Sequence, residues 1–257
     1  MKPPTLIPRP ETEDWALRLS SLLVKALKQA PVDASRDYSP PVRILDLCCG
    51  SGCIGLLLAY ELEKAGLHHW RVTLADLKDT ALELTTLNAG KIAQQLGKSA
   101  SSTSRIQQSI QITKADLFND RDIDALRQDG QGYDVLVCNP PYIPQRDWKD
   151  LDRSVKEWED VDALVGMRRP YVTDKIDEEG LAFYERLGQL LPRLLSARSQ
   201  RTPLFPIAVF EVGINQASRV VAMMKKASKE SDLGRVAWEV WRDAWGVERA
   251  VVGYNKP

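Results

Sequence analysis

The sequence contains few of the side chains that bind transition metals or form disulfide frameworks. Its 257 residues include only two histidines, which are adjacent, and four cysteines. The cysteines, Cys48, Cys49, Cys53 and Cys138, lie in or beside apolar runs and lack the paired C-x-x-C spacing of zinc sites. Such cysteines are typical of a reduced core. We therefore expect no metal ion, no disulfide and a reducing compartment.

The sequence also lacks an excess of either charge and any long apolar run. Lys+Arg and Asp+Glu both count 35, so the net charge is zero. A protein that grips a nucleic-acid backbone needs a basic face, and stable nucleic-acid binding is therefore not expected. No run approaches the about 20 apolar residues needed to span a bilayer, and no signal peptide is visible. We expect no membrane association.

Strand-like apolar runs alternate with helical patterns, which predicts one α/β domain with a mostly parallel sheet covered on both faces. The last two strand-like runs have no helix between them, so a C-terminal antiparallel hairpin is expected. The expected strands are 42–47, 71–76, 110–116, 133–139, 205–213 and two within 236–254; the expected helices are 11–27, 52–66, 79–97, 121–128, 178–196 and 214–228.

Two segments are predicted to be mobile loops. Residues 97–109 read GKSASSTSRIQQS, a polar and Ser-rich stretch between a helix and a strand. Residues 143–177 form a connection that is long for a compact domain. Connections of that length are usually functional or disordered.

A glycine-rich turn follows the first strand. Gly50, Gly52 and Gly55 satisfy G-x-G-x-x-G, and Asp76 ends the next strand. This is the dinucleotide fingerprint, although the pattern alone is a weak signal. Glycines let the backbone approach a ligand closely, and an acidic side chain at a strand end can accept two ribose hydroxyls. The turn therefore suits any cofactor that contains adenosine.

Asp46 distinguishes between these cofactors. It lies four residues before Gly50, where a carboxylate is unwelcome beside a pyrophosphate. A carboxylate suits a cofactor that carries an ammonium and a sulfonium group, which describes S-adenosylmethionine. The competing interpretation is a glycine turn used only for packing, and Asp46 and Asp76 together disfavour it.

The motif NPPY follows the fourth strand, so it lies at the same carboxyl edge of the sheet as the glycine turn. Prolines remove N–H donors and stiffen the backbone, which leaves the Pro140 carbonyl and the Asn139 side-chain oxygen as two acceptors. Tyr142 supplies a flat wall. Two acceptors and a wall fit a planar NH₂ group, and holding both N–H bonds aligns the nitrogen lone pair with a methyl carbon.

Together these motifs resemble those of the HemK-type glutamine N5-methyltransferases, which modify the Gly-Gly-Gln glutamine of translation release factors. NPPY is shared with amino-methyltransferases that act on nucleic-acid bases, whereas its pairing with PRPETE is specific. The matching segments are IPRPETE (7–13), DLCCGSGCIGL (46–56), ADLF (115–118), NPPYIP (139–144), EEGLAFY (178–184), FEVGINQ (210–216) and RDAWGVERAVVG (242–253).

The resemblance implies a Rossmann-like class I S-adenosylmethionine-dependent methyltransferase fold with a seven-stranded sheet. It implies S-adenosylmethionine as cofactor, S-adenosylhomocysteine as product and a peptide chain release factor as protein substrate. The implied catalytic residues are Asn139, Pro140 and Tyr142; cofactor-binding residues are Asp46, Cys48, Cys49, Gly50, Ser51, Gly52, Asp76, Asp116, Leu117 and Asn139; substrate-binding residues are Asn139, Pro140, Pro141, Tyr142, Arg9, Glu11 and Thr12.

The sequence departs from the family pattern in several places. The family usually carries a helical domain before PRPETE, and we expect residues 1–257 to be the catalytic domain without it. Residues 1–40 would form the entrance segment and a lead-in helix, and 41–257 the Rossmann-like core. Cys48-Cys49 replaces small residues, Asp160 stands where proline is usual after glutamate, and 167–178 resembles an insertion.

Other functions compete with glutamine methylation. One is methylation of an exocyclic amine on a DNA or RNA base, which the neutral charge disfavours; another is a non-catalytic cofactor-binding scaffold, which the intact NPPY disfavours. A dehydrogenase is the weakest alternative.

We expect a monomer. Because the family acts on bacterial and organellar release factors, and the Ser-rich and charged insertions suggest a eukaryotic member, a mitochondrial matrix location is predicted, with a cytoplasmic one as the alternative.

Overall fold

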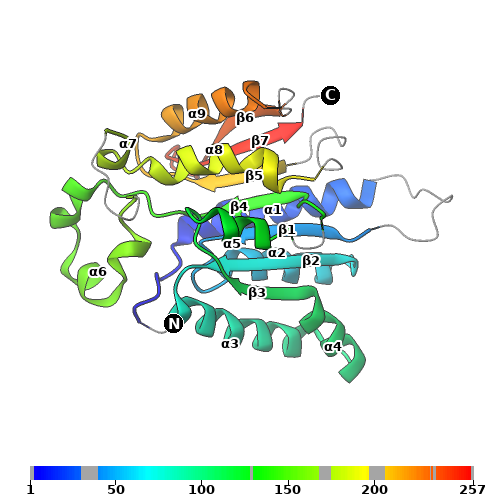
Figure 1. Cartoon of the computed structure of the whole chain (residues 1–257). Coiled ribbons are helices and arrows are strands. Elements are labelled where there is room, and N and C mark those ends of the chain that lie inside the picture. Colours follow the sequence, from blue (N-terminus) through cyan, green and yellow to red (C-terminus); the bar gives the residue numbers. More distant parts are fainter. Residues whose placement is uncertain are drawn as a thin grey trace.

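The computed structural model describes residues 3–29, 40–127, 130–167, 175–196, 206–231, 233 and 236–255. These residues contain a seven-stranded sheet with the order β3-β2-β1-β4-β5-β7-β6 (Figure 1). The strands are β1 (Val42–Leu47), β2 (Trp70–Asp76), β3 (Ile110–Lys114), β4 (Val135–Cys138), β5 (Pro206–Glu211), β6 (Val236–Arg242) and β7 (Glu248–Asn255).

The five strands from β3 to β5 are parallel, and β7 runs antiparallel to both β5 and β6. Every residue of β4 and β5 is buried, as expected for central strands covered on both faces. The predicted mostly parallel sheet with a C-terminal antiparallel hairpin is therefore confirmed. Its strand bounds follow the apolar runs within a few residues.

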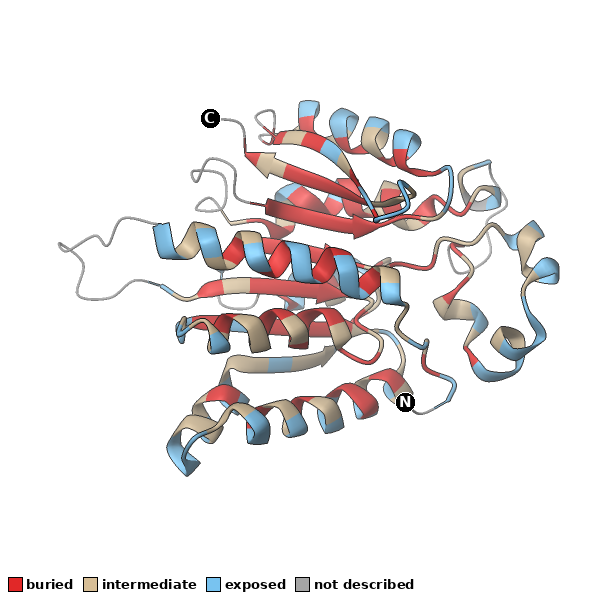
Figure 2. Cartoon of the chain, turned by 180° about the vertical axis from the view of Figure 1, so that it is seen from behind, coloured by how far each residue is buried: buried red, intermediate tan, exposed pale blue. Residues whose placement is uncertain are grey.

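Helices cover both faces of the sheet (Figures 1 and 2). One face carries α1 (Pro10–Gln29), α2 (Cys53–Lys64) and α3 (Asp79–Leu96), and the other carries α5 (Asp120–Ala125), α8 (Ala182–Leu194) and α9 (Ala217–Lys229). Figure 2 shows buried residues along the sheet-facing side of the helices, with exposed residues outside. Among the described helices, none is long and apolar enough to cross a membrane.

The segment 97–109 is not a mobile loop, so that prediction was wrong. Residues Ala100–Ser109 form helix α4, which Ser99 caps with its side chain and Ser102 completes as a capping box. Ile106 is fully buried and anchors the helix to the domain. The Ser-rich composition misled because serine favours the helix N-terminus as well as loops.

The segment 143–177 contains short helices rather than an extended loop. These are η1 (Gln145–Asp150), α6 (Arg153–Trp158), η2 (Val161–Ala163) and the start of α7 (Lys175–Glu178), while the predicted mobility of 168–174 lies outside the described residues. The expected helix 178–196 is split because Gly180 adopts φ +70 between α7 and α8. A Cβ on Gly180 would lie 2.2 Å from the Tyr142 carbonyl oxygen, so this glycine packs directly against the NPPY motif.

Candidate active site

The turn after β1 has a backbone shape that its sequence explains. Cys48, Gly50 and Gly52 all have positive φ values, of 55°, 55° and 77°. A Cβ on Gly52 would lie 2.9 Å from the Thr85 Cγ2 atom, so glycine is needed there for space as well as conformation. Helix α3 fixes the turn from the side, since the Thr85 hydroxyl donates to the Gly50 carbonyl at 2.8 Å.

Asp76, at the end of β2, joins this turn to the following loop. Its two carboxylate oxygens accept hydrogen bonds from the backbone N–H of Gly50 at 2.8 Å and of Lys78 at 2.9 Å. Burial raises the pKa of Asp76, and these hydrogen bonds oppose the rise. Each carboxylate oxygen can accept a further hydrogen bond, so Asp76 can still bind ligand hydroxyls.

Asp46 lies beneath the turn and does not line the cavity described below. Its side chain has no solvent exposure, and Oδ2 accepts a hydrogen bond from the Gly55 N–H at 2.8 Å. Oδ1 has no hydrogen-bond partner among the described residues. Burial raises the pKa of Asp46 to about 7. Asp46 therefore has one oxygen without a described hydrogen-bond partner, but it lies under the turn and not on the cavity wall.

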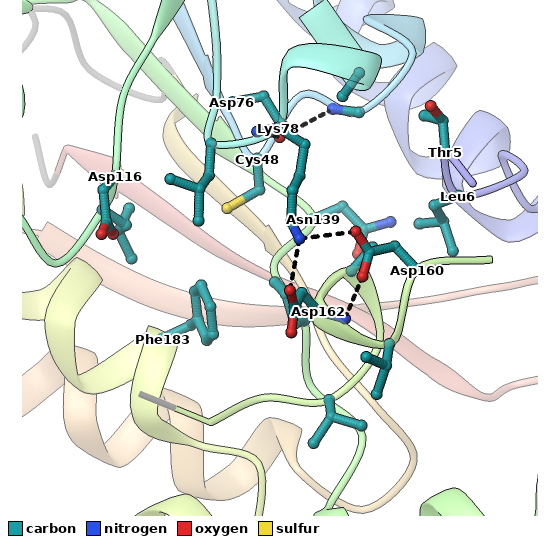
Figure 3. Close-up of a pocket in the computed structure, with 18 of the residues that line it drawn as sticks. Thr5, Leu6, Cys48, Asp76, Lys78, Asp116, Asn139, Asp160, Asp162 and Phe183 are labelled. Atoms are coloured by element: carbon teal, nitrogen blue, oxygen red, sulfur yellow. Dashed lines mark hydrogen bonds and ion pairs between the residues drawn. The ribbon is translucent and has the colours of Figure 1, made fainter. Parts of the chain in front are cut away.

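A cavity of about 270 Å³ opens at the carboxyl edge of the sheet (Figure 3). One side is formed by the ends of β1 and β2, and another by Phe183 of α8 and the segment after β3. Residues 4–6, 160–163 and 165 also line it. Of the predicted site residues, the cavity brings together Cys48, Gly50, Asp76, Asp116, Leu117, Asn139 and Pro141.

Pro140 and Tyr142 do not line the cavity, and the side chains of Tyr142 and Asn139 contact a second, buried group of side chains. The Tyr142 hydroxyl donates to Glu211 Oε1 at 3.4 Å, and the Thr12 hydroxyl donates to Glu211 Oε2 at 2.6 Å. The Asn139 amide NH₂ donates to the Thr12 hydroxyl oxygen at 3.5 Å. The PRPETE and NPPY segments, 127 residues apart, thus meet at the end of β5.

The predicted entrance residues Arg9 and Glu11 are held by ion pairs from other segments. Arg9 Nη2 lies 2.7 Å and 2.9 Å from the two carboxylate oxygens of Glu159, which is buried. Glu11 lies 3.3 Å from Arg249 on β7, and Arg249 also pairs with Asp243 at 2.8 Å. These contacts fix the start of α1 beside the site, although neither Arg9 nor Glu11 lines the cavity.

The structure adds site residues that the sequence reasoning missed. Lys78 reaches from the loop after β2 to Asp160 at 2.9 Å and to Asp162 at 2.6 Å (Figure 3). These contacts join segments far apart in the chain, and no local pattern signals them. Phe183 faces the cavity as well. Glu211 could have been found, because it is a carboxylate at a strand end, as are Asp46 and Asp76.

Solved structures share this fold. A human methyltransferase 10 domain containing protein matches with a TM-score of 0.51 and 15% identity, over 98% of this chain and 84% of that one. An S-adenosylmethionine-dependent methyltransferase from Agrobacterium tumefaciens matches with a TM-score of 0.51 and 12% identity, over 97% of this chain and 63% of that one. The predicted class I methyltransferase fold is confirmed. No protein-family model matches the chain.

Sequence relatives carry more specific names. A release factor glutamine methyltransferase from Bacillus cereus is 30% identical over 223 residues, which are 86% of this chain and 60% of the relative. The chain is similar to the release factor glutamine methyltransferases. The human MTRF1L release factor glutamine methyltransferase is 31% identical, over 76% of this chain and 47% of the relative. The probable MRF1 mitochondrial N(5)-glutamine methyltransferase mtq1 of Schizosaccharomyces pombe is 28% identical, over 84% and 59%.

The chain therefore spans between about half and 60% of the length of these relatives.

Three observations from the structure indicate that the site residues fit S-adenosylmethionine. Asp76 keeps free acceptor capacity, Asp46 has a buried oxygen without a described partner, and the backbone from Cys48 to Gly52 is open at Gly50, where an added Cβ would meet no atom within 4 Å. These observations concern the cofactor side; the roles of individual residues remain predictions.

Proposed function

We propose that the chain is the catalytic part of an enzyme that transfers a methyl group to the side-chain amide nitrogen of the glutamine in the Gly-Gly-Gln motif of a release factor. The observation that carries this proposal is that Asn139 and Pro141 of NPPY line the same cavity as Gly50 and Asp76. The proposed amide site and the proposed adenosine site would thus share one space. Relatives named for this activity support it.

The cofactor would be held by residues from the ends of three neighbouring strands. Asp76 would accept the ribose hydroxyls, Asp116 and Leu117 would border the adenine, and Cys48 to Gly52 would contact the methionine part. S-adenosylmethionine supplies an electrophilic methyl group when bound. Asp46, buried beneath the turn, would favour a cationic cofactor because an opposite charge stabilises its carboxylate.

The substrate amide would be held by the NPPY motif. The Asn139 side-chain oxygen and the Pro140 carbonyl would accept its two N–H bonds, while the Tyr142 ring would form a wall against its plane. Holding both N–H bonds directs the nitrogen lone pair toward the methyl carbon, so positioning supplies most of the rate gain. No strong base is needed beforehand, since the nitrogen becomes acidic once it is alkylated. Arg9, Glu11 and Thr12 would border the entrance.

The test is methyl transfer from labelled S-adenosylmethionine to a purified release factor. We expect label in the release factor, and loss of that label when its Gly-Gly-Gln glutamine is changed to alanine. Asn139→Ala should lower the rate by at least about a hundredfold, because the acceptor is no longer positioned. S-adenosylhomocysteine binding, measured by calorimetry, should change little.

Other outcomes would contradict the proposal. Label found only in nucleic acid would favour the base methyltransferase, which shares NPPY. The non-catalytic scaffold would be favoured if the chain, and a longer form with an upstream helical domain, both bind the cofactor but methylate neither substrate. An Asn139→Ala variant with full activity would refute the role of Asn139.

The partner is proposed to be a release factor bound transiently by a monomeric enzyme. A mitochondrial location is supported by the Schizosaccharomyces pombe relative, whose name is mitochondrial, whereas the bacterial relatives leave a cytoplasmic location as the alternative. Fluorescence microscopy of the tagged full-length gene product would decide between them. Light scattering with and without release factor would test the monomer.

A further inference from the structure

Glu211 is a buried carboxylate that accepts hydrogen bonds from two segments of the candidate site. It ends β5, is 4% exposed and does not line the cavity. Its Oε2 accepts from the Thr12 hydroxyl at 2.6 Å and from the Trp15 indole N–H at 2.8 Å, and its Oε1 accepts from the Tyr142 hydroxyl at 3.4 Å. Such a carboxylate is costly to bury unless its contacts compensate.

The direction of these hydrogen bonds is fixed by chemistry. An indole N–H can only donate, so Glu211 Oε2 must accept from Trp15. The Thr12 hydroxyl has one proton, and it donates that proton to the same Oε2 atom. This direction holds for the ionised Glu211 carboxylate, because both of its oxygens can then only accept.

The Thr12 oxygen is therefore left as an acceptor toward Asn139. The Asn139 atom 3.5 Å from it must then be the NH₂ nitrogen, because an amide oxygen there would face another acceptor. An Asn side chain can otherwise adopt two flipped arrangements of similar shape. With its NH₂ group held at Thr12, the Asn139 oxygen is the end that remains for the cavity, which Asn139 lines.

We propose that Glu211 and Thr12 are positioning residues that hold the Asn139 amide with its oxygen, rather than its NH₂ group, available to the substrate. The inference rests on the proposed function, in which that oxygen accepts an N–H from the substrate glutamine. A flipped Asn139 would place an NH₂ group against the substrate NH₂ group. Two donors would then face each other, and the acceptor nitrogen would lose its alignment.

The first test changes Thr12, which is buried and can be altered with little change in volume. Thr12→Val removes the Thr12 acceptor of the Asn139 NH₂ group, which also interacts with Glu211, and Thr12→Ser keeps it. We expect Thr12→Val to lower kcat for release-factor methylation by roughly tenfold to a hundredfold, with S-adenosylhomocysteine affinity unchanged. Thr12→Ser should restore most of kcat. If Thr12 only supported the fold, both variants would have a lower melting temperature, and kcat would not be lower in Thr12→Val than in Thr12→Ser.

The second test changes Glu211. In Glu211→Gln, the amide oxygen can take the position of Oε2, which Trp15 and Thr12 contact. The Trp15 indole N–H requires an acceptor at that position. Glu211→Met removes every acceptor. We expect Glu211→Gln to retain a larger share of kcat than Glu211→Met. Glu63→Gln serves as the control, because Glu63 is near the opposite edge of the sheet, where it pairs with Arg105; its kcat should equal the wild-type value.

A structural readout separates this inference from the proposed function. In protein with labelled asparagine side chains, nuclear Overhauser contacts should connect the Asn139 NH₂ protons to the Thr12 side chain. They should weaken in Thr12→Val. Absence of these contacts in the wild type would overturn the inference whatever the activity, and so would full kcat in Thr12→Val. Wild-type protein that shows the contacts but methylates no release factor would contradict the proposed function alone.

Discussion

Asp46 lies at the end of β1 without solvent exposure, and burial raises its pKa from 3.8 to about 7. The folded protein therefore holds this proton more tightly than the unfolded chain does. The stabilisation is complete below the unfolded pKa and is lost as the pH rises through the folded one. Asp46 thus destabilises the cofactor-free protein at neutral and alkaline pH.

We predict that Asp46→Asn removes this pH dependence. Its amide oxygen can still accept from the Gly55 N–H. The free energy of unfolding of the wild type should fall by up to about 4 kcal/mol more than that of the variant between about pH 4 and about pH 8. Urea unfolding at several pH values measures this, and parallel curves for the two proteins would contradict it.

Asp76 has a different proposed role, because its two oxygens hold the backbone of the turn that we propose contacts the cofactor. Asp76→Ala should weaken S-adenosylhomocysteine binding by roughly tenfold to a hundredfold, since it removes hydrogen bonds to a charged acceptor. Asp79→Asn is the matched control, because Asp79 begins α3 nearby and pairs with Lys114 at the surface. Calorimetric titration should find unchanged affinity in the control and a clear loss in Asp76→Ala.

Helix α4 is an element that was not predicted from the sequence. Its composition indicated a loop, whereas its capping box and one buried side chain, Ile106, stabilise a helix. The split of the expected helix 178–196 has a comparable origin. Gly180 packs against the Tyr142 carbonyl, a contact that only the folded chain provides.

We predict that Ser99→Ala destabilises α4. Loss of an N-cap side chain costs about 1 kcal/mol, and the helix amides should exchange with solvent faster. Ser104→Ala, inside the same helix, should be neutral or slightly stabilising, because alanine is the better helix former. Hydrogen-exchange mass spectrometry on the peptide that covers 100–109 compares them. Equal exchange in both variants would show that the cap does not hold the helix.

Lys78 connects two elements across the cavity. It pairs with Asp160 and Asp162 of the segment after α6, and this segment also binds the N-terminal arm through the hydrogen bond from the Asp160 N–H to the Pro4 carbonyl. Lys78 therefore joins the segment over the cavity to the end of β2.

We predict that Lys78→Met speeds release of S-adenosylhomocysteine a few-fold. Partly exposed ion pairs contribute at most about 1 kcal/mol each, so a larger effect is not expected. Lys114→Met, which breaks the exposed pair with Asp79, should leave the release rate unchanged. Stopped-flow displacement measures the rate, and high salt should reduce the difference between Lys78→Met and the wild type.

For the molecule as a whole, the mostly parallel sheet, its C-terminal antiparallel hairpin and the shared carboxyl edge could be predicted from the sequence. Continuous apolar runs located β1, β4 and β5 because buried parallel strands need them. The rule that ligands bind at the carboxyl ends of strands located Asp76 and Asn139. The contacts of Lys78 and Glu211 could not be predicted in the same way, since they depend on how distant segments meet after folding.

We propose above all that one cavity brings a glutamine amide to a methyl donor. Mass spectrometry of a release factor incubated with the chain and S-adenosylmethionine tests it most directly, because fragmentation locates the added methyl group. We expect a single methyl group on the side-chain amide of the Gly-Gly-Gln glutamine, and no methyl group there with Asn139→Ala. A methyl group on any other residue, or on a nucleic-acid base in place of the protein, would contradict it.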